Sequence, residues 1–322
     1  MSKSLYFILF FLVTVQTSFA FKIFAVQHQD LKTYEQIFTA YKHKLPENYK
    51  IYSFNGDGDI NRLEAYIQML QHDISVDLVL SLGTIAGKLS IKHIKNKPII
   101  ISGIASPGYS GIIQDWNQSG KNYTVIECKN ITYKTLRTFY AIYKFKNIGL
   151  IYLSKAPSHI GTFKEATAFC NDYNVKLISS SFDNRDQNKI LLPKEIIQER
   201  LIKACLDVIP YVDFLYLNTS NTFLQNIGSI ISLANRYEVI TIGSNIYSDY
   251  GISIEITSDF FQRGVVAAEY TEEILMENTD ISTLPMNIIK DFVVRYNYFS
   301  GTSNDLDLTT KFLNKGIDLQ IK

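Results

Sequence analysis

Short apolar runs alternate with longer amphipathic stretches along the chain after residue 20. In the first half, runs rich in Ile, Val, Leu and Tyr predict strands at 22–26, 50–54, 77–81 and 98–102. The stretches between them have apolar residues at helical spacing and predict helices at 31–44, from a cap at Asp59 or Asn61 to about 71, and at 84–94. Alternation of this kind builds a parallel sheet with helices on both faces.

A loop-rich interval at 105–121 interrupts this pattern, which then restarts. The second half predicts strands at 147–153, 175–181, 213–217, 239–242, 251–256 and 291–296. It predicts helices at 160–173, 193–209, 221–237, 259–277 and 309–315. The halves share an architecture without sharing a sequence, so we expect two similar α/β lobes, which suits a length of 322 residues.

The first twenty residues differ from the rest and resemble an export signal. Lys3 gives a short basic start, Leu5 to Val15 form an apolar run, and Ser18 to Ala20 place small residues where a signal peptidase cuts. An uncleaved anchor is the alternative, but this run is short of the roughly twenty residues that span a bilayer. We expect cleavage near Ala20, no lipid anchor because no Cys follows the run, and a periplasmic protein.

The charge of the chain is balanced. There are 32 Lys and Arg against 31 Asp and Glu, a formal net charge of +1, with no long run of either sign. This balance argues against a nucleic-acid surface or a polybasic membrane patch. Cys128, Cys170 and Cys205 have no metal or redox spacing, and either one disulfide or three buried thiols would fit them.

The sequence contains none of the common enzymatic motifs. It lacks GxSxG, HExxH, a Walker A loop and a GxGxxG after the first predicted strand. The segment after Asn55 begins like an EF-hand loop, but Ile60 replaces its glycine and Tyr66 its bidentate glutamate. We therefore expect no enzymatic activity, no cofactor and no metal. An exported enzyme is the alternative, which turnover of its ligand would reveal.

Function is expected in the loops after the strands, because ligands of open parallel sheets bind beyond the carboxyl ends of the strands. Most residues there are small or carry a neutral polar group. Gly83 and Thr84 stand where a helix begins, so its N–H groups would suit a carboxylate, although Thr84 could simply cap the helix. The candidate ligand-binding residues are Gln27, His28, Gly83, Thr84, Ser106, Ser158, His159, Thr219, Asn221, Ser244 and Asn245.

Some loop residues allow two interpretations. His28 and His159 come from different lobes and could contact a ligand together, or could be ordinary exposed histidines. Tyr109 and Tyr247 could stack on a planar ligand, or could pack on their own lobe as aromatic side chains usually do.

Several blocks, in this order, resemble a known family. They are Asn55-x-x-Gly58-Asp59, Asp77 to Thr84, Lys97 to Ile100, Asn147 to Tyr152, Thr219 to Thr222, Ile242 to Ser244, and Asp259 to Gly264. Their order is similar to that of the ABC-transporter substrate-binding family that includes periplasmic tryptophan- and tyrosine-binding proteins. The resemblance spans almost the whole chain after the export signal.

The resemblance implies a type I periplasmic-binding-protein fold, a Venus flytrap of two Rossmann-like lobes with parallel sheets. It places residues 21–126 and 254–288 in the first lobe, and 127–253 and 289–322 in the second. It also implies a monomer that encloses a small organic, amino-acid-like solute between its lobes and presents the closed form to the permease subunits of an ABC transporter. A sensor subunit of the same fold, signalling to a histidine kinase or chemoreceptor, is the alternative.

Three turns depart from the family in the same direction. The family often has Ser-Asp-Pro, Thr-Asp-Asn and Ser-Asp-Glu, where this chain has Ala105-Ser106-Pro107, Thr219-Ser220-Asn221 and Ser244-Asn245-Ile246. Carboxylates that could face an ammonium group are thus missing, which makes a standard amino acid less secure as the ligand. Glu255 could supply the charge instead, or could lie exposed on its strand.

Overall fold

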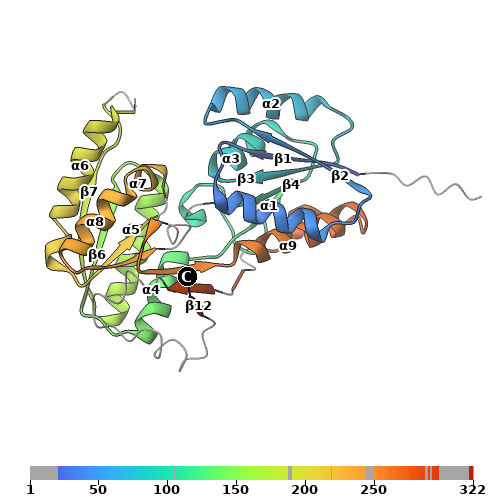
Figure 1. Ribbon diagram of the computed structural model, residues 1–322. Coiled ribbons are helices and arrows are strands. Elements are labelled where there is room, and N and C mark those ends of the chain that lie inside the picture. The colour runs from blue at the N-terminus through green and yellow to red at the C-terminus, as the bar shows by residue number, and fades with distance from the viewer. Residues whose placement is uncertain are drawn as a thin grey trace, which may run out of the picture.

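The computed structural model describes residues 21–104, 106–187, 191–218, 220–243, 250–286, 289–290, 292–296 and 319–321. Two α/β lobes lie side by side, each built on its own sheet (Figure 1). The predicted export signal lies outside these ranges. Within them, no helix has the length and apolar character that crossing a membrane requires.

The first lobe is built on a five-stranded parallel sheet in the order β2-β1-β3-β4-β5. Successive residues of β1 and β3 point to opposite faces, and both faces are buried against helices. Its elements are β1 (Phe21–Gln27), α1 (Lys32–Lys44), β2 (Tyr49–Asn55), α2 (Ile60–His72), β3 (Leu78–Leu82), α3 (Thr84–His93), β4 (Ile99–Ser102), η1 (Pro107–Tyr109) and β5 (Tyr123–Ile126).

One helix from late in the sequence completes the first lobe. In α9 (Phe260–Leu275), the side chain of Asp259 accepts from the amides of Phe261 and Gln262 and so caps the start. The helix packs closely on α1, because a Cβ at Gly264 would lie 2.2 Å from the carbonyl oxygen of Ile37. The 3-10 turn η4 (Ile281–Thr283) follows on the same lobe.

The second lobe is built on a seven-stranded sheet in the order β12-β11-β10-β9-β8-β6-β7. All its pairings are parallel except that between β10 and β11. Its elements are α4 (Ile131–Ile142), β6 (Asn147–Leu153), α5 (Pro157–Tyr173), β7 (Lys176–Phe182), α6 (Lys194–Leu206), η2 (Ile209–Tyr211), β8 (Phe214–Leu217), α7 (Asn221–Gln225), α8 (Ile227–Arg236), β9 (Ile240–Gly243), β10 (Ile254–Ser258), β11 (Phe292–Tyr296) and β12 (Leu319–Ile321).

The lobe boundary expected at residue 254 differs from the structure. β10 pairs with β9 and β11, so it belongs to the second sheet, and the chain crosses to the first lobe only after Ser258. At the next crossing, Ile289 still packs in the core of the first lobe. Hydrogen bonding to β9 extends the second sheet before the chain leaves it, which the sequence pattern does not register.

Most predicted elements are present, with local differences. Asp59 caps α2, as expected for one of the two candidate residues. The sequence pattern did not predict β5 or α4. For β5 the reason is that four residues are too few to show a period. The helix predicted at 221–237 is two helices that meet at Asn226.

The three cysteines are free and buried, which is one of the two alternatives that the sequence left open. Burial raises the pKa of Cys170 and Cys205 to about 12, so both thiols stay protonated and unreactive at neutral pH.

Candidate functional site

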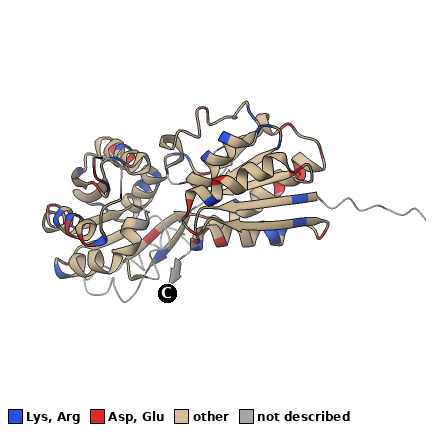
Figure 2. Ribbon diagram, turned by 90° about the horizontal axis from the view of Figure 1, so that it is seen from above, with Lys and Arg blue, Asp and Glu red and all other residues tan. Residues whose placement is uncertain are grey.

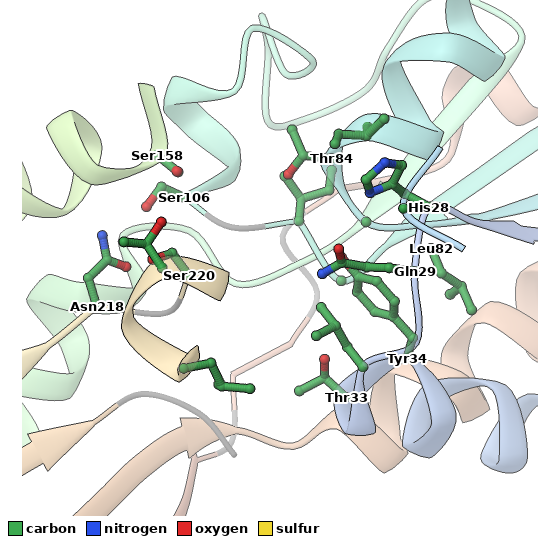
Figure 3. Close-up of a pocket in the computed structure, with 18 of the residues that line it drawn as sticks. His28, Gln29, Thr33, Tyr34, Leu82, Thr84, Ser106, Ser158, Asn218 and Ser220 are labelled. Carbon is green, nitrogen blue, oxygen red and sulfur yellow. The ribbon is translucent and has the colours of Figure 1, made fainter. Parts of the chain in front are cut away.

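A pocket of about 620 Å³ lies between the two lobes. In Figure 3, His28, Gln29 and Tyr34 of the first lobe lie across it from Asn218 and Ser220 of the second. The lining residues come mostly from loops after strands and from the first turns of helices, where ligands of parallel sheets bind.

Tyr34 fits against two glycines on the first-lobe wall. A Cβ at Gly83 would lie 2.1 Å from the Tyr34 hydroxyl, and a Cβ at Gly103 would lie 2.8 Å from the Tyr34 ring. Both glycines also have positive φ, 94° and 75°, which other residues rarely adopt. Burial and the nearby Glu127 charge raise the pKa of Tyr34, so its hydroxyl remains protonated and can donate a hydrogen bond.

The first turn of α3 opens into this pocket. Gly83 is the N-cap, and no side chain caps the helix, so the alternative that Thr84 is the cap is wrong. Thr84 is the first helical residue, and it lines the pocket together with Ile85. The Gly83 amide donates to Ser102 of the next strand, at 2.8 Å, which fixes the turn. The free amides of this turn and the Thr84 hydroxyl can therefore bind an acceptor group.

Neutral polar side chains dominate the second-lobe wall. Ser158 and Thr162 lie on α5, Asn218 follows β8, and Ser220 accepts from the Phe223 amide at the start of α7. Thr162 is 3.3 Å from Ser106 of the first lobe, hydroxyl to hydroxyl, so the two lobes are in contact on one side of the pocket. These groups can donate to or accept from a ligand without bringing charge.

A buried ion pair lies at the first-lobe side of the pocket. Arg263 of α9 and Glu127, which directly follows β5, are 2% and 1% exposed, and Arg263 Nη1 lies 2.6 Å from Glu127 Oε2. Glu127 Oε1 accepts from the Ile104 amide at 2.6 Å, and Arg263 also donates to Ser258. Arg263 itself lines the pocket. Burial raises the pKa of Glu127, and the Arg263 charge opposes that rise.

Glu165 of α5 holds the start of α4 behind the second-lobe wall. Its Oε2 accepts from the amides of Thr132, at 2.9 Å, and Tyr133, at 3.5 Å, where α4 has no cap of its own. Burial raises the pKa of Glu165 to about 7, against these hydrogen bonds and the charge of Lys134. This carboxylate thus orients Thr132, which lines the pocket.

Five of the eleven candidate residues line the pocket, namely His28, Gly83, Thr84, Ser106 and Ser158. Thr219, Ser244 and Asn245 lie outside the described residues, as does Tyr247. For Asn221 only the backbone is described, at the start of α7.

Two candidates point elsewhere. Gln27 donates to Asp30 at 2.6 Å and faces a neighbouring hollow, because alternate residues of β1 face opposite sides of the sheet. His159 is 1% exposed within α5, where its Nδ1 accepts from the Leu153 amide at 3.1 Å. Burial lowers its pKa to about 4, so it is a neutral core residue, neither a ligand contact nor an exposed loop histidine.

Two other predictions also fail. Glu255 is 1% exposed, accepts from Arg295 at 2.8 Å across β10 and β11, and is not in the pocket lining, so it is neither a counter-charge for a ligand nor exposed. The Tyr109 ring packs on Gly161 of α5, in the other lobe, outside the pocket.

Sequence reasoning missed Tyr34, Thr132, Thr162, Lys194 and Arg263. These five residues lie on helices, so their side chains reach parts of the pocket that the loops after strands do not form. Arg185 and Leu191, between β7 and α6, were missed as well. Arg263 carried a usable signal, since it is a charge on the buried face of α9.

Comparisons with known proteins agree with this geometry. Residues 23–309 match the family model described as ABC transporter substrate binding protein. A conserved domain protein from Vibrio cholerae has a TM-score of 0.73 at 17% identity, covering 94% of this chain and 100% of that one. A Streptococcus pneumoniae ABC domain solved with L-Trp has the same TM-score and identity, over 93% and 100%.

A substrate-binding protein with adhesive properties from Clostridium difficile, solved open and free of ligand, has a TM-score of 0.69 at 16% identity, over 94% and 99%. No curated protein matches the chain. The structural neighbours have the type I periplasmic-binding-protein fold, and so does this chain. Since the family model covers most of its length, the chain belongs to the substrate-binding proteins of ABC transporters.

Proposed function

We propose that the protein is the periplasmic solute-binding component of an ABC transporter and that it acts without chemical turnover. It encloses one small organic molecule between its lobes and presents the closed form to the permease. The observation that carries this is the 620 Å³ pocket, lined from both lobes by neutral hydrogen-bonding groups, basic side chains and apolar side chains.

Closure follows from the position of the pocket. A ligand that contacts both walls interacts with more protein when the lobes are closed, so it shifts the population toward that state. The three connections after β5, after β10 and before β11 allow the lobes to move as units. The N-terminal twenty residues would direct export, with cleavage near Ala20, and the mature protein would act as a monomer.

The test begins with the protein purified from the periplasm. Mass spectrometry of the molecules released on denaturation should find one solute, which should raise the melting temperature when added back. Incubation should return the solute unchanged. An altered solute would contradict the binding function.

Thr84→Trp tests whether this pocket is the site. The bulky ring should abolish the thermal shift, because Thr84 lines the pocket at the start of α3. Lys88→Trp, one turn later on an exposed part of the same helix, should keep it. If Thr84→Trp kept the thermal shift as Lys88→Trp does, the ligand would bind at another site.

A further inference from the structure

We propose, building on the function above, that the solute is an organic anion with an apolar body and no ammonium group. The pocket combines basic side chains, neutral hydrogen-bond donors and aliphatic surface. This selects a carboxylic acid or similar anion over the amino acid of the same shape.

The charged side chains of the described pocket lining are all basic. Among the described lining residues, three are basic, Arg185, Lys194 and Arg263, and none is acidic. Arg263 and Glu127 neutralise each other in their buried ion pair, so Arg263 adds no net charge to the pocket, and Glu165 accepts from the amides of α4. An ammonium enclosed here would lose its hydration without gaining a carboxylate from these walls, which is unfavourable.

This polarity is local to the pocket. Figure 2 shows acidic and basic residues interspersed over both lobes, in keeping with the net charge of +1. The basic character of the pocket lining therefore does not reflect a basic surface of the whole protein.

Lys194 stands where the helix itself disfavours it. It is the first residue of α6, and a positive charge at a helix N-terminus opposes the helix dipole. It is exposed and, among the residues that the structure describes, has no carboxylate partner. A cation in this place does not stabilise its own helix, whereas it would attract an anion into the pocket.

The donors for such an anion lie on both walls. On the first lobe, the uncapped first turn of α3 and the Thr84 hydroxyl face the pocket. On the second lobe, Ser158, Ser220 and Asn218 supply hydroxyl and amide groups. Carboxylate oxygens accept from all of these groups.

The rest of the lining suits an aliphatic or aromatic body. Ile60 and Ile85 of the first lobe are exposed at the pocket, as is Leu191 of the second. Leu224 and Phe260 add apolar surface from α7 and α9. Closure over an apolar body would bury these side chains.

The first experiment compares matched solutes by calorimetric titration and thermal shift. Each set holds an acid, the amino acid and the amine with one side chain. The sets are 3-phenylpropionate, phenylalanine and 2-phenylethylamine; 4-methylpentanoate, leucine and 3-methylbutylamine; and indole-3-propionate, tryptophan and tryptamine. We expect at least one acid to bind ten-fold or more tightly than its amino acid, and no amine to bind. An amino acid or amine that binds more tightly than its acid would overturn the proposal while leaving the solute-binding function intact.

The molecule released from the native protein decides the case independently. A carboxylate, sulfonate or phosphate without an amine supports the proposal, and a molecule with a primary amine overturns it. Absence of any released molecule, together with no shift from all nine probes, would instead contradict the solute-binding function itself.

One variant and a matched control test the contribution of the Lys194 charge. Lys194→Gln should weaken the best acid several-fold and reduce the loss of its affinity in high salt, without lowering the melting temperature of the empty protein. The control Lys203→Gln, at the other end of α6, should leave the affinity unchanged. Equal losses of affinity in the two variants would contradict a specific role of the Lys194 charge in binding the anion.

Asp249 lies outside the described residues. If an amino acid bound to the wild type but not to Asp249→Asn, Asp249 would be the partner of its ammonium group, and the proposal would be overturned.

Discussion

Arg263 and Glu127 form an ion pair of 2.6 Å that joins two of the connections between the lobes. Glu127 lies where the chain leaves β5 for α4, and Arg263 lies in the first turn of α9, just after the chain returns from β10. Both side chains are at most 2% exposed. The pair therefore links the two connections beside the pocket, and each buried charge is stabilised by the other.

Removing one partner of this pair should lower the free energy of unfolding far more than removing both. Glu127→Gln leaves Arg263 charged and buried without its counter-ion, which should lower the free energy of unfolding by about 3–5 kcal/mol. The double variant Glu127→Leu with Arg263→Leu should recover much of this loss. Urea unfolding measures both.

An exposed pair supplies the control. Lys92→Met removes one of two partners of Glu64, the other being His93. Because the lysine side chain is 64% exposed, the change should alter stability by less than about 1 kcal/mol. If the double Leu variant were as unstable as Glu127→Gln, mutual neutralisation of the buried charges would not be what matters.

Gly83→Ala should be more destabilising than a substitution at another glycine with positive φ. Gly111 has φ 78° and open space around its Cβ position, so Gly111→Ala should cost only the conformational strain, about 1–2 kcal/mol. At Gly83 the new methyl also meets Tyr34, and overpacking should add about 1–3 kcal/mol. Melting temperatures of the two variants compare them directly, and equal losses would mean that Tyr34 is not held against Gly83.

Glu165 should make the protein more stable as the pH falls. Its pKa is about 7 in the folded protein against 4.5 for an ordinary glutamate, so the folded state binds the proton more tightly. The free energy of unfolding should therefore rise, by at most about 3 kcal/mol, between pH 7 and pH 4.5. In Glu165→Gln this contribution should be absent, and a wild-type-minus-variant difference that stays flat with pH would contradict the buried carboxylate.

His159 should act in the opposite direction. Its pKa is about 4 in the folded protein against 6.5 for an ordinary histidine, so the unfolded state binds the proton more tightly. Stability should be lost between pH 6.5 and pH 4, again by at most about 3 kcal/mol. His159→Asn, which can still accept from the Leu153 amide, should remove this loss. Chemical unfolding at several pH values measures it, and an unchanged profile would place His159 in contact with solvent.

The pattern of apolar runs predicted the two-lobed architecture well because strands buried on both faces and amphipathic helices each leave a clear period. It missed β5, whose four residues show no period. The lobe boundaries implied by the family resemblance set β10 in the wrong lobe, because the pairing of β10 with β9 is a long-range contact. These errors fall at the crossings, where tertiary contacts decide the path.

The site was predicted only in part, because tertiary contacts also decide which side chains reach the pocket. Loops after strands reach the pocket, so His28, Thr84 and Ser158 were found. His159 was misplaced because a helix that begins at Pro157 turns it into the core. The sequence marks Arg263 only as a charge on the buried face of α9. Its partner Glu127 is 136 positions away in the sequence, so spacing could not identify the ion pair.

Capture of a solute between moving lobes can be measured as a distance. Spin labels on cysteines introduced at Lys88 of α3 and Lys203 of α6 would report on opposite lobes, and both positions are exposed. The buried native thiols, with pKa raised, should resist labelling. Adding the solute recovered from the native protein should shorten and narrow the distance distribution between the labels. A distribution that does not change when the solute is bound would contradict closure around a ligand, and with it the central claim.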